Sequence, residues 1–332
     1  MKLATFRPGA ESPRVGVVSA DMQSIIDAVG LAKAQGASAG PYLSMLALIE
    51  AGPEALNQLK DWVDSPSLGS EAWLPIASVA LDAPIPRPPR LRCFSVYEKH
   101  LVNAFKQVLR HKLGRVAFAL VNGLGLIKAP KRFFKVPAYY KGNHLAVTGP
   151  GQVIIWPSYS RMLDYELELA LVIGKSGKDI EVGDAPAHIF GYTIFNDFSA
   201  RDALMEEMGI GPSAGPAKGK DFDTSNAIGP WIVTADELDN PESLAMTVSV
   251  NGVERGRARV GEMTHSISAL IAFASRGETL QPGEVFSCGA VGGGTGIESW
   301  TFLNPGDRVD LSIEGIGTLT NTLGDASHFK AL

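Results

Sequence analysis

The chain has few cysteines, no apolar run of membrane-spanning length and no signal-like start. Its two cysteines, Cys93 and Cys288, lie far apart and form neither a disulfide framework nor a metal-binding cysteine pattern. The longest apolar stretches, such as residues 116–127, fall short of the roughly 20 residues that a membrane-spanning helix needs. No basic segment followed by an apolar one opens the sequence, so we expect no secretory signal. We therefore expect a cytoplasmic protein with reduced thiols and no membrane partner.

Acidic residues are missing from one long segment. Between Glu98 and Asp164 there is no Asp or Glu but there are eleven Lys and Arg, whereas the rest of the chain carries 19 basic and 35 acidic residues. The net charge of −5 argues against general nucleic-acid binding. The basic segment either raises the local concentration of a small anion near a site or pairs with acidic surface elsewhere, for instance across a subunit interface. Both interpretations remain open.

Proline divides the chain into two predicted domains. Residues 82–91 contain four prolines in ten positions, which excludes a helix and indicates an extended linker. A small N-terminal domain is therefore expected over residues 1–81, with helices over residues 43–51 and 53–62. The larger, catalytic domain is expected over residues 92–332.

The larger domain is predicted to be rich in strands. An amphipathic helix is expected over residues 98–113, with its apolar residues on one side, and a second helix over residues 266–274. Strand patterns separated by turns rich in Gly, Pro and Asn cover residues 152–156, 163–174, 191–197, 231–234, 245–250, 285–288 and 308–313. Because strands and helices do not alternate regularly, the pattern favours an α+β fold over a doubly wound sheet.

Three carboxylates suggest a metal site. In residues 163–174 leucines alternate with acidic residues, so Glu166 and Glu168 are expected on the same face of a strand. Burying two unpaired carboxylates together is costly, and a divalent cation removes that cost. A second predicted strand, residues 191–197, ends at Asp197. Three carboxylates without a nearby Cys or His suit a hard ion, with Mg²⁺ expected first and Ca²⁺ or Mn²⁺ as alternatives. The other interpretation is a solvent-exposed strand face.

Residues after Asp197 have structural as well as functional interpretations. Ser199 and Asp202 have the spacing of a capping box, which gives Asp202 a structural role. Arg201 either projects toward a metal-bound anion or forms a salt bridge on its helix. The glycine-rich residues 209–219 are typical of a mobile active-site loop.

Several motifs, in one order, resemble the fumarylacetoacetate hydrolase family. They are Asp-Tyr-Glu-Leu-Glu-Leu-Ala at residues 164–170, Gly-Tyr-Thr-Ile-Phe-Asn-Asp-Phe-Ser-Ala-Arg-Asp at 191–202, Gly-Lys-Asp-Phe at 219–222 with Gly-Pro-Trp at 229–231, and Gly-Ile-Gly-Thr-Leu-Thr-Asn at 315–321. The resemblance covers about residues 90–322. It implies an α+β fold in which a mixed β-sheet roll, usually dimeric, follows a small N-terminal α/β domain.

The resemblance also assigns residues to roles. It implies metal ligation by Glu166, Glu168 and Asp197. It implies substrate binding by Arg201, Lys220 and Tyr97, and catalysis by His100, Glu298 and Lys220.

Some positions differ from fumarylacetoacetase itself. Cys93 stands where that enzyme has an aspartate metal ligand, and Ser95 stands where it has a substrate-binding tyrosine. Ala290 replaces a threonine and Leu204 a common glutamine. A related enzyme with a different, less polar substrate is therefore expected.

The implied activity is metal-dependent hydrolysis of a carbon–carbon bond in a β-diketone acid of the acylpyruvate type. The metal would act as a Lewis acid, His100 would activate water, Glu298 would orient His100, and Lys220 would stabilise the oxyanion. A lyase or isomerase of keto acids (decarboxylase, dehydratase or keto–enol isomerase) is the alternative, and a non-catalytic metal-binding protein is a third. The expected partners are a small anionic keto acid and a second copy in a homodimer, without nucleic acid.

Overall fold

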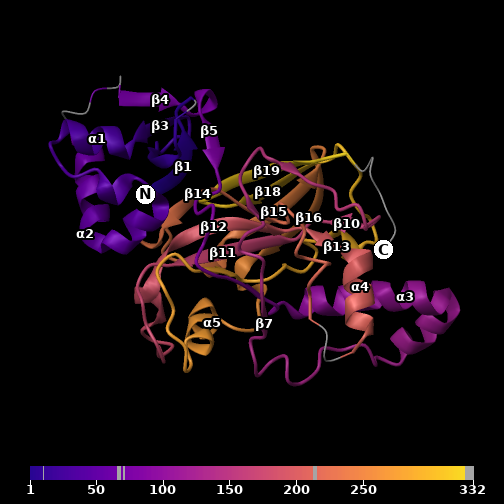
Figure 1. Ribbon diagram of the computed structural model, residues 1–332. Coiled ribbons are helices and arrows are strands. Elements are labelled where there is room, and N and C mark those ends of the chain that lie inside the picture. The colour runs from indigo at the N-terminus through magenta and orange to yellow at the C-terminus, as the bar shows by residue number, and fades with distance from the viewer. Residues whose placement is uncertain (10, 66–68, 70–71, 212–214, 326–332) are drawn as a thin grey trace.

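The largest sheet joins the N-terminal strands to strands from the rest of the chain (Figure 1). The computed structural model describes residues 1–9, 11–65, 69, 72–211 and 215–325. The 12-stranded sheet has the order β4-β3-β2-β1-β14-β12-β11-β17-β6-β7, with β5 beside β1 and β8 beside β14. These strands are β1 (Lys2–Arg7), β2 (Arg14–Val18), β3 (Ser24–Asp27), β4 (Trp73–Pro75), β5 (Ala80–Asp82), β6 (Leu91–Phe94), β7 (Tyr139–Lys141), β8 (Val147–Thr148), β11 (Leu167–Ile173), β12 (Ile189–Asp197), β14 (Asn226–Thr234) and β17 (Val285–Ser287).

The described residues also form two smaller sheets, five α-helices and several short 3₁₀ helices. The five-stranded sheet has the order β16-β15-β18-β19-β9, and β10 pairs with β13. The bounds of these strands are β9 (Val153–Ile154), β10 (Leu163–Asp164), β13 (Ser199–Ala200), β15 (Ala245–Val250), β16 (Val253–Arg259), β18 (Arg308–Ile313) and β19 (Gly317–Leu323). The helices are α1 (Ala28–Ala34), α2 (Met45–Val63), α3 (Glu98–Gly123), α4 (Arg201–Gly209) and α5 (Ile267–Ala274). The α+β prediction is confirmed. None of the helices in these ranges is long and apolar enough to cross a bilayer.

The N-terminal residues form a lobe in Figure 1, but their strands continue the large sheet. Strand β1 pairs with β14 in antiparallel register, with Leu3 opposite Ile232. Leu3 and Ile232 also belong to one buried apolar cluster together with Phe195 of β12. The predicted N-terminal domain, residues 1–81, therefore shares both sheet and core with the rest of the chain.

The N-terminal helices follow the glycine and proline signals. The two expected helices at residues 43–51 and 53–62 form one element, α2, which is interrupted at Gly52. Gly52 has φ of 78°, which an L-residue adopts only under strain, and Pro53 restarts the helix.

Both faces of β11 are buried. Leu167, Leu169 and Leu171 belong to one apolar cluster, whereas Ala170 and Val172 belong to another. The acidic residues that alternate with the leucines consequently lie inside the protein. This excludes the solvent-exposed strand face as the interpretation of Glu166 and Glu168, which are 6% and 2% exposed.

Helix α3 differs from its prediction. It continues ten residues past the expected end at residue 113 and is kinked at Gly114, where φ is 76°. The expected apolar side does not face a core, because none of the side chains of α3 is fully buried and Phe105 is 53% exposed. Polar side chains of α3 instead contact the loop around Glu298, so the helix is held by hydrogen bonds.

The capping-box prediction at Ser199 was wrong. Ser199 lies in β13 and its hydroxyl donates to the backbone oxygen of Asp197, while α4 begins after Ala200 without a side-chain cap. Asp202 has the expected structural role through other contacts: its carboxylate accepts hydrogen bonds from Ser160 Oγ and from the backbone nitrogen of Arg161. Part of the glycine-rich segment 209–219, residues 212–214, lies outside the described residues.

Candidate metal centre and catalytic pair

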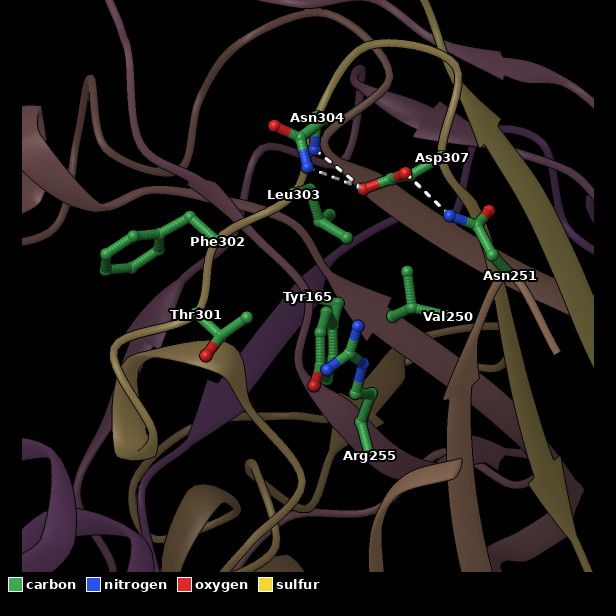
Figure 2. A pocket seen from close by; sticks show the side chains of 9 residues that line it. All are labelled: Tyr165, Val250, Asn251, Arg255, Thr301, Phe302, Leu303, Asn304 and Asp307. Carbon is green, nitrogen blue, oxygen red and sulfur yellow. Dashed lines mark hydrogen bonds between the residues drawn. The ribbon is translucent and has the colours of Figure 1, made fainter. Parts of the chain in front are cut away.

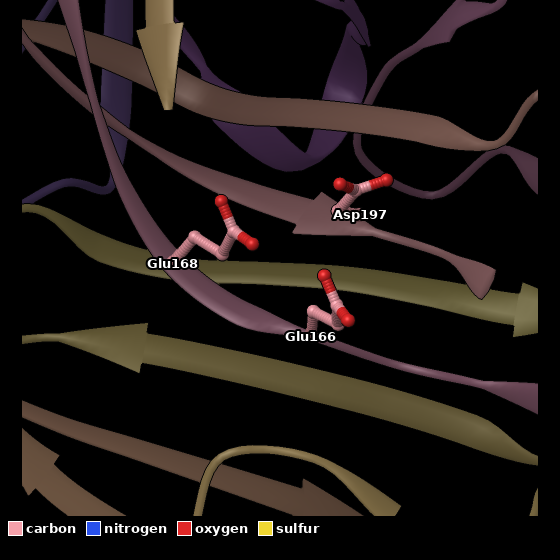
Figure 3. A group of neighbouring side chains, drawn as sticks. All are labelled: Glu166, Glu168 and Asp197. Carbon is pink, nitrogen blue, oxygen red and sulfur yellow. The ribbon is translucent and has the colours of Figure 1, made fainter. Parts of the chain in front are cut away.

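The three predicted ligands meet where β11 and β12 lie side by side. Glu168 is in β11, Glu166 immediately precedes β11, and Asp197 ends β12. Each offers a carboxylate oxygen, and these oxygens lie within 4.8 Å of one another. Figure 3 shows the three carboxylates pointing toward a common space. The strand period and the pairing of β11 with β12 bring the ligands together.

Unsatisfied buried oxygens make this cluster suitable for a cation. Glu168 Oε2 and Asp197 Oδ1 are buried without a hydrogen-bond partner, although both side chains are almost inaccessible to solvent. Buried polar atoms are normally bonded, and a buried charge needs a partner. An all-oxygen donor set of three carboxylates fits a hard divalent cation such as Mg²⁺ or Mn²⁺.

The carboxylates differ in their electrostatic setting. Burial raises the pKa of Glu168 well above its ordinary value, and the neighbouring Asp197 and Glu166 raise it further. Burial also raises the pKa of Asp197, to about 6, against the opposing effect of Lys220. Burial alone would raise the pKa of Glu166, but Lys220 and Arg201 reverse the shift and hold it below its ordinary value. Glu166 is therefore the carboxylate of the cluster whose ionised form its neighbours favour most.

Two buried, positively charged side chains, those of Lys220 and Arg201, contact the cluster. Lys220 Nζ lies 2.8 Å from Glu166 Oε2 and 3.1 Å from Asp197 Oδ2. Burial would lower the pKa of Lys220, but these two carboxylates raise it above the ordinary value, so the amine is protonated. Arg201 lies 2.7 Å from Glu166 through Nη2 and 2.7 Å from Asp164 through Nε. Arg201 thus forms ion pairs across the sheet, whereas the sequence suggested a salt bridge on its own helix.

Asp164 is a site residue that the sequence analysis did not assign. It is fully buried and accepts hydrogen bonds from Arg201 Nε at 2.7 Å and from the backbone nitrogens of Gly296 at 2.7 Å and Ile297 at 2.9 Å. It thereby fixes Arg201 and the loop that carries Glu298. Asp164 belongs to the same alternation as Glu166 and Glu168, which was the available signal.

The structure brings His100 and Glu298 together. His100 Nδ1 lies 2.9 Å from Glu298 Oε1, and Asn103, one turn further along α3, donates to Glu298 Oε2 at 2.9 Å. Glu298 ends the short 3₁₀ helix Gly296–Glu298, whose position Asp164 fixes. The pair adjoins the carboxylate cluster, because Thr295 pairs with Glu166 in a β-bridge and its Oγ1 lies 3.5 Å from His100 Nδ1.

Tyr97 does not have the exposed hydroxyl that substrate binding requires. It is 2% exposed within the apolar core, and its hydroxyl donates to the backbone oxygen of Val260 at 2.8 Å. The substrate-binding role expected for Tyr97 is therefore replaced by a packing role. The tyrosine that does contact the cluster is Tyr140, whose hydroxyl donates to Asp197 Oδ2. No spacing signal in the sequence identified Tyr140, because β6 and β7 join it to Cys93 only through the fold.

Two of the positions that differ from fumarylacetoacetase, Cys93 and Leu204, are buried. Cys93 is 1% exposed, and burial followed by the nearby Asp197 and Glu168 raises the pKa of its thiol well above the ordinary value. Leu204 is also buried and adjoins Gly219, where an added Cβ would lie 2.6 Å from the Leu204 Cβ. Cys93 thus places a neutral thiol near the cluster, whereas Leu204 places an apolar side chain beside Gly219, the residue before Lys220.

A small pocket of about 120 Å³ lies on the leucine side of the strand, beside Tyr165 and Arg255 (Figure 2). Its carboxylate, Asp307, accepts hydrogen bonds from Asn251 Nδ2 at 2.7 Å and from the backbone nitrogen of Asn304 at 2.8 Å. These contacts stabilise turns. The pocket is separate from the carboxylate cluster.

Comparisons with known proteins agree with this arrangement. The family model for the fumarylacetoacetate (FAA) hydrolase C-terminal domain matches residues 107–324. Oxaloacetate tautomerase YisK of Bacillus subtilis (strain 168) is 34% identical over 272 residues, which cover 81% of this chain and 81% of that protein. Mitochondrial oxaloacetate tautomerase fahd2 of Xenopus laevis is 32% identical over 325 residues, covering 97% and 89%.

A solved structure extends the comparison to almost the whole chain. Maleylpyruvate hydrolase from Sphingobium sp. SYK-6, in complex with manganese(II) ion and pyruvate, has a TM-score of 0.70 and 26% identity, and the match covers 98% of this chain and 100% of that one. Because the family model matches more than half of the sequence and relatives align over most of it, the chain belongs to the fumarylacetoacetate hydrolase family.

Proposed function

We propose that the protein is a metal-dependent tautomerase that interconverts the keto and enol forms of a small 2-oxo dicarboxylic acid of the oxaloacetate type. The observation that carries this proposal is the juxtaposition of a buried three-carboxylate cluster with the His100–Glu298 pair. The two relatives described above, YisK and fahd2, are both oxaloacetate tautomerases, which supports this reaction for the present site.

Each group has a role in this reaction. Glu166, Glu168 and Asp197 would hold a divalent cation, Mg²⁺ by preference, which would supply Lewis acidity to the site. His100 removes the proton from the carbon next to the keto group through Nε2, because Nδ1 is held by Glu298. The C–H bond breaks as its proton moves to Nε2, and the new N–H bond then breaks as that proton is delivered to the former keto oxygen. An O–H bond forms there and His100 is restored, so no atom is gained or lost.

The positively charged side chains of Lys220 and Arg201 complete the site. Lys220 is protonated and stabilises negative charge on the substrate oxygen. Arg201, which pairs with Asp164 through Nε and with Glu166 through Nη2, would bind a substrate carboxylate beside these ion pairs. The anionic 2-oxo acid thus meets positive charge beside the metal ligands.

Hydrolysis of a carbon–carbon bond in an acylpyruvate is the second candidate. It is favoured by the oriented His100, which can take a proton from water as readily as from carbon, and by the structural similarity to maleylpyruvate hydrolase. The two reactions share the stabilised enolate, so the carboxylate cluster does not discriminate between them.

A product assay separates these functions. The protein, supplemented with Mg²⁺ or Mn²⁺ and compared with a sample in chelator, is given the enol form of oxaloacetate and, separately, acylpyruvates. Accelerated loss of enol absorbance with the oxaloacetate mass unchanged supports the tautomerase. Acid plus pyruvate from an acylpyruvate assigns the hydrolase, and carbon dioxide from oxaloacetate assigns a decarboxylase. Metal-dependent melting without turnover of any of these compounds contradicts all three and leaves a non-catalytic metal-binding protein.

A further inference from the structure

The outer end of α3 and the residues just after it carry large apolar side chains that are exposed to solvent. Val116 is 79% exposed, Leu120 68%, Leu124 71% and Leu126 69%. The kink at Gly114 separates this segment, residues 116–126, here called the apolar tip, from the half of α3 that contacts Glu298. Figure 1 shows the outer end of α3 at the edge of the molecule away from the N-terminal lobe. A contiguous exposed apolar segment of this kind marks an interaction surface.

Basic residues flank the apolar tip on both sides. All of them are exposed, and within the ranges that the structure describes none forms an ion pair: Arg110, Lys112, Arg115, Lys128, Lys131, Arg132 and Lys135. The sequence from 99 to 163 contains no acidic residue that could neutralise them. The apolar tip is therefore surrounded by uncompensated positive charge.

We propose that the apolar tip inserts into the interface of a membrane that contains anionic lipids. Apolar side chains of an interfacial helix enter the boundary between headgroups and acyl chains, while flanking Lys and Arg contact lipid phosphates. Their long stems allow the charged ends to stay hydrated during this insertion. The segment is too short to cross a bilayer, so the protein lies on the membrane.

The charge pattern favours a lipid surface over a second copy of the chain. A protein partner that buried the apolar tip would also have to neutralise or desolvate seven cations, which is costly without matched carboxylates. An anionic bilayer offers an apolar interior and negative charge over any area of contact. The expectation of no membrane partner depended on the absence of a spanning segment, and interfacial binding does not require one.

Vesicle sedimentation with the full-length protein tests the proposal. The wild type should sediment with vesicles of phosphatidylcholine and phosphatidylglycerol at low salt, bind much less to phosphatidylcholine alone, and dissociate as salt is raised. The double substitution Leu120→Asp and Leu124→Asp should lower binding at least about tenfold. Val253→Asp is the matched control, because Val253 is 57% exposed in β16 and lies outside the tip; it should bind like the wild type.

A double charge-reversal substitution tests the electrostatic part of the membrane-binding proposal. Lys128→Glu with Lys131→Glu should weaken binding to the anionic vesicles and reduce its salt dependence, because two contacts to lipid phosphates are lost. Lys175→Glu with Lys178→Glu makes the same change of charge at two exposed positions outside the segment and should leave binding near the wild-type level.

A fluorescent label reports insertion directly. Both native cysteines are buried, so an environment-sensitive dye reacts selectively with a cysteine introduced by Leu124→Cys. Anionic vesicles should shift its emission to the blue, whereas a dye at Val253→Cys should not respond. The proposal is overturned if the wild type ignores anionic vesicles at low salt, or if the dye at position 124 is already shielded in a dimer without lipid. Equal binding by the charge-reversed and control variants also overturns it.

Discussion

His100 Nδ1 lies 2.9 Å from Glu298 Oε1, although 198 positions separate the two residues in the chain. The Glu298 carboxylate is itself held by the backbone nitrogen of Gly293 at 2.9 Å, by Asn103 Nδ2 at 2.9 Å and by Thr295 Oγ1 at 3.2 Å. A carboxylate fixed by three donors fixes the imidazole ring in turn, which leaves Nε2 as the nitrogen for proton transfer.

Replacing His100 by Ala should lower turnover by about 10²–10⁴-fold, because a positioned acid–base group contributes about that factor. The rise in melting temperature caused by Mg²⁺ or Mn²⁺ should persist, since His100 is not a metal ligand. Steady-state kinetics and thermal melting of the same preparation provide both measurements.

His111→Ala is the control for this change. His111 lies on the same helix, stacks on Trp300 at 3.7 Å between ring centroids, and bonds through Nδ1 to the backbone oxygen of Gln107. Its ring is therefore engaged away from the Glu298 carboxylate, and its loss should change turnover only slightly. Full activity of His100→Ala would remove His100 from the mechanism.

Two neighbouring glutamates should respond differently to the same substitution. In the metal-free protein Glu166→Gln should lower the free energy of unfolding by about 3–5 kcal/mol, because it breaks the buried ion pairs with Lys220 and Arg201. Glu168→Gln should not lower it, since Glu168 Oε2 has no partner and its ionisation is opposed by burial. Denaturant titration in chelator measures both.

The same two substitutions distinguish an effect on folding stability from an effect on metal binding. Both glutamine variants should lose most of the metal-induced rise in melting temperature, because each removes a negatively charged ligand. A Glu168→Gln protein that keeps a normal metal-induced rise and normal activity would show that the cluster does not hold the functional cation.

Metal stabilisation should decrease as the pH falls. The pKa of Asp197 is raised to about 6 and that of Glu168 is also raised, so the metal-free folded protein binds protons that the unfolded chain has released. These two carboxyl groups therefore add to the free energy of unfolding of the metal-free protein below their ordinary pKa values. That contribution is lost as the pH rises above those values and toward 6. A cation must displace those protons, so the metal-induced rise in melting temperature should be largest near pH 8 and smaller near pH 5. A rise that does not change between these pH values would contradict the assignment of the ligands.

The sequence was sufficient for the features that depend on local periodicity. A strand has a period of two, so the alternation around Glu166 and Glu168 is enough to predict their common face. Strands β15 and β18 were predicted with the bounds they have. By contrast, β16 was missed because its sequence, Val-Glu-Arg-Gly-Arg-Ala-Arg, is charged and mostly exposed, without an apolar alternation to reveal it.

Local sequence patterns could not predict the features that depend on long-range contacts. The pairing of β1 with β14, which joins the N-terminal strands to the large sheet, leaves no trace in either strand alone. The contact between His100 and Glu298 was expected only from the family resemblance. Tyr140 reaches Asp197, and Tyr97 turns into the core, because of how β6, β7 and β12 pack, which spacing along the chain does not encode.

Gly296 should be intolerant of a side chain, and its substitution tests how the fold positions Glu298. A Cβ at Gly296 would overlap the backbone oxygen of Thr301 and approach the Asp164 carboxylate, which accepts the Gly296 N–H at 2.7 Å. Gly296→Ala should therefore displace the turn Gly296–Glu298, lower the free energy of unfolding by about 1–3 kcal/mol, and reduce turnover. Gly123→Ala, at the end of α3, is the control: no atom lies within 4 Å of the added Cβ, so stability and turnover should be maintained. Because the metal ligands lie on other elements, Gly296→Ala should keep the metal-induced rise in melting temperature while its turnover falls. Normal turnover in a destabilised Gly296→Ala protein would show that the position of this turn, and with it Glu298, does not limit the reaction.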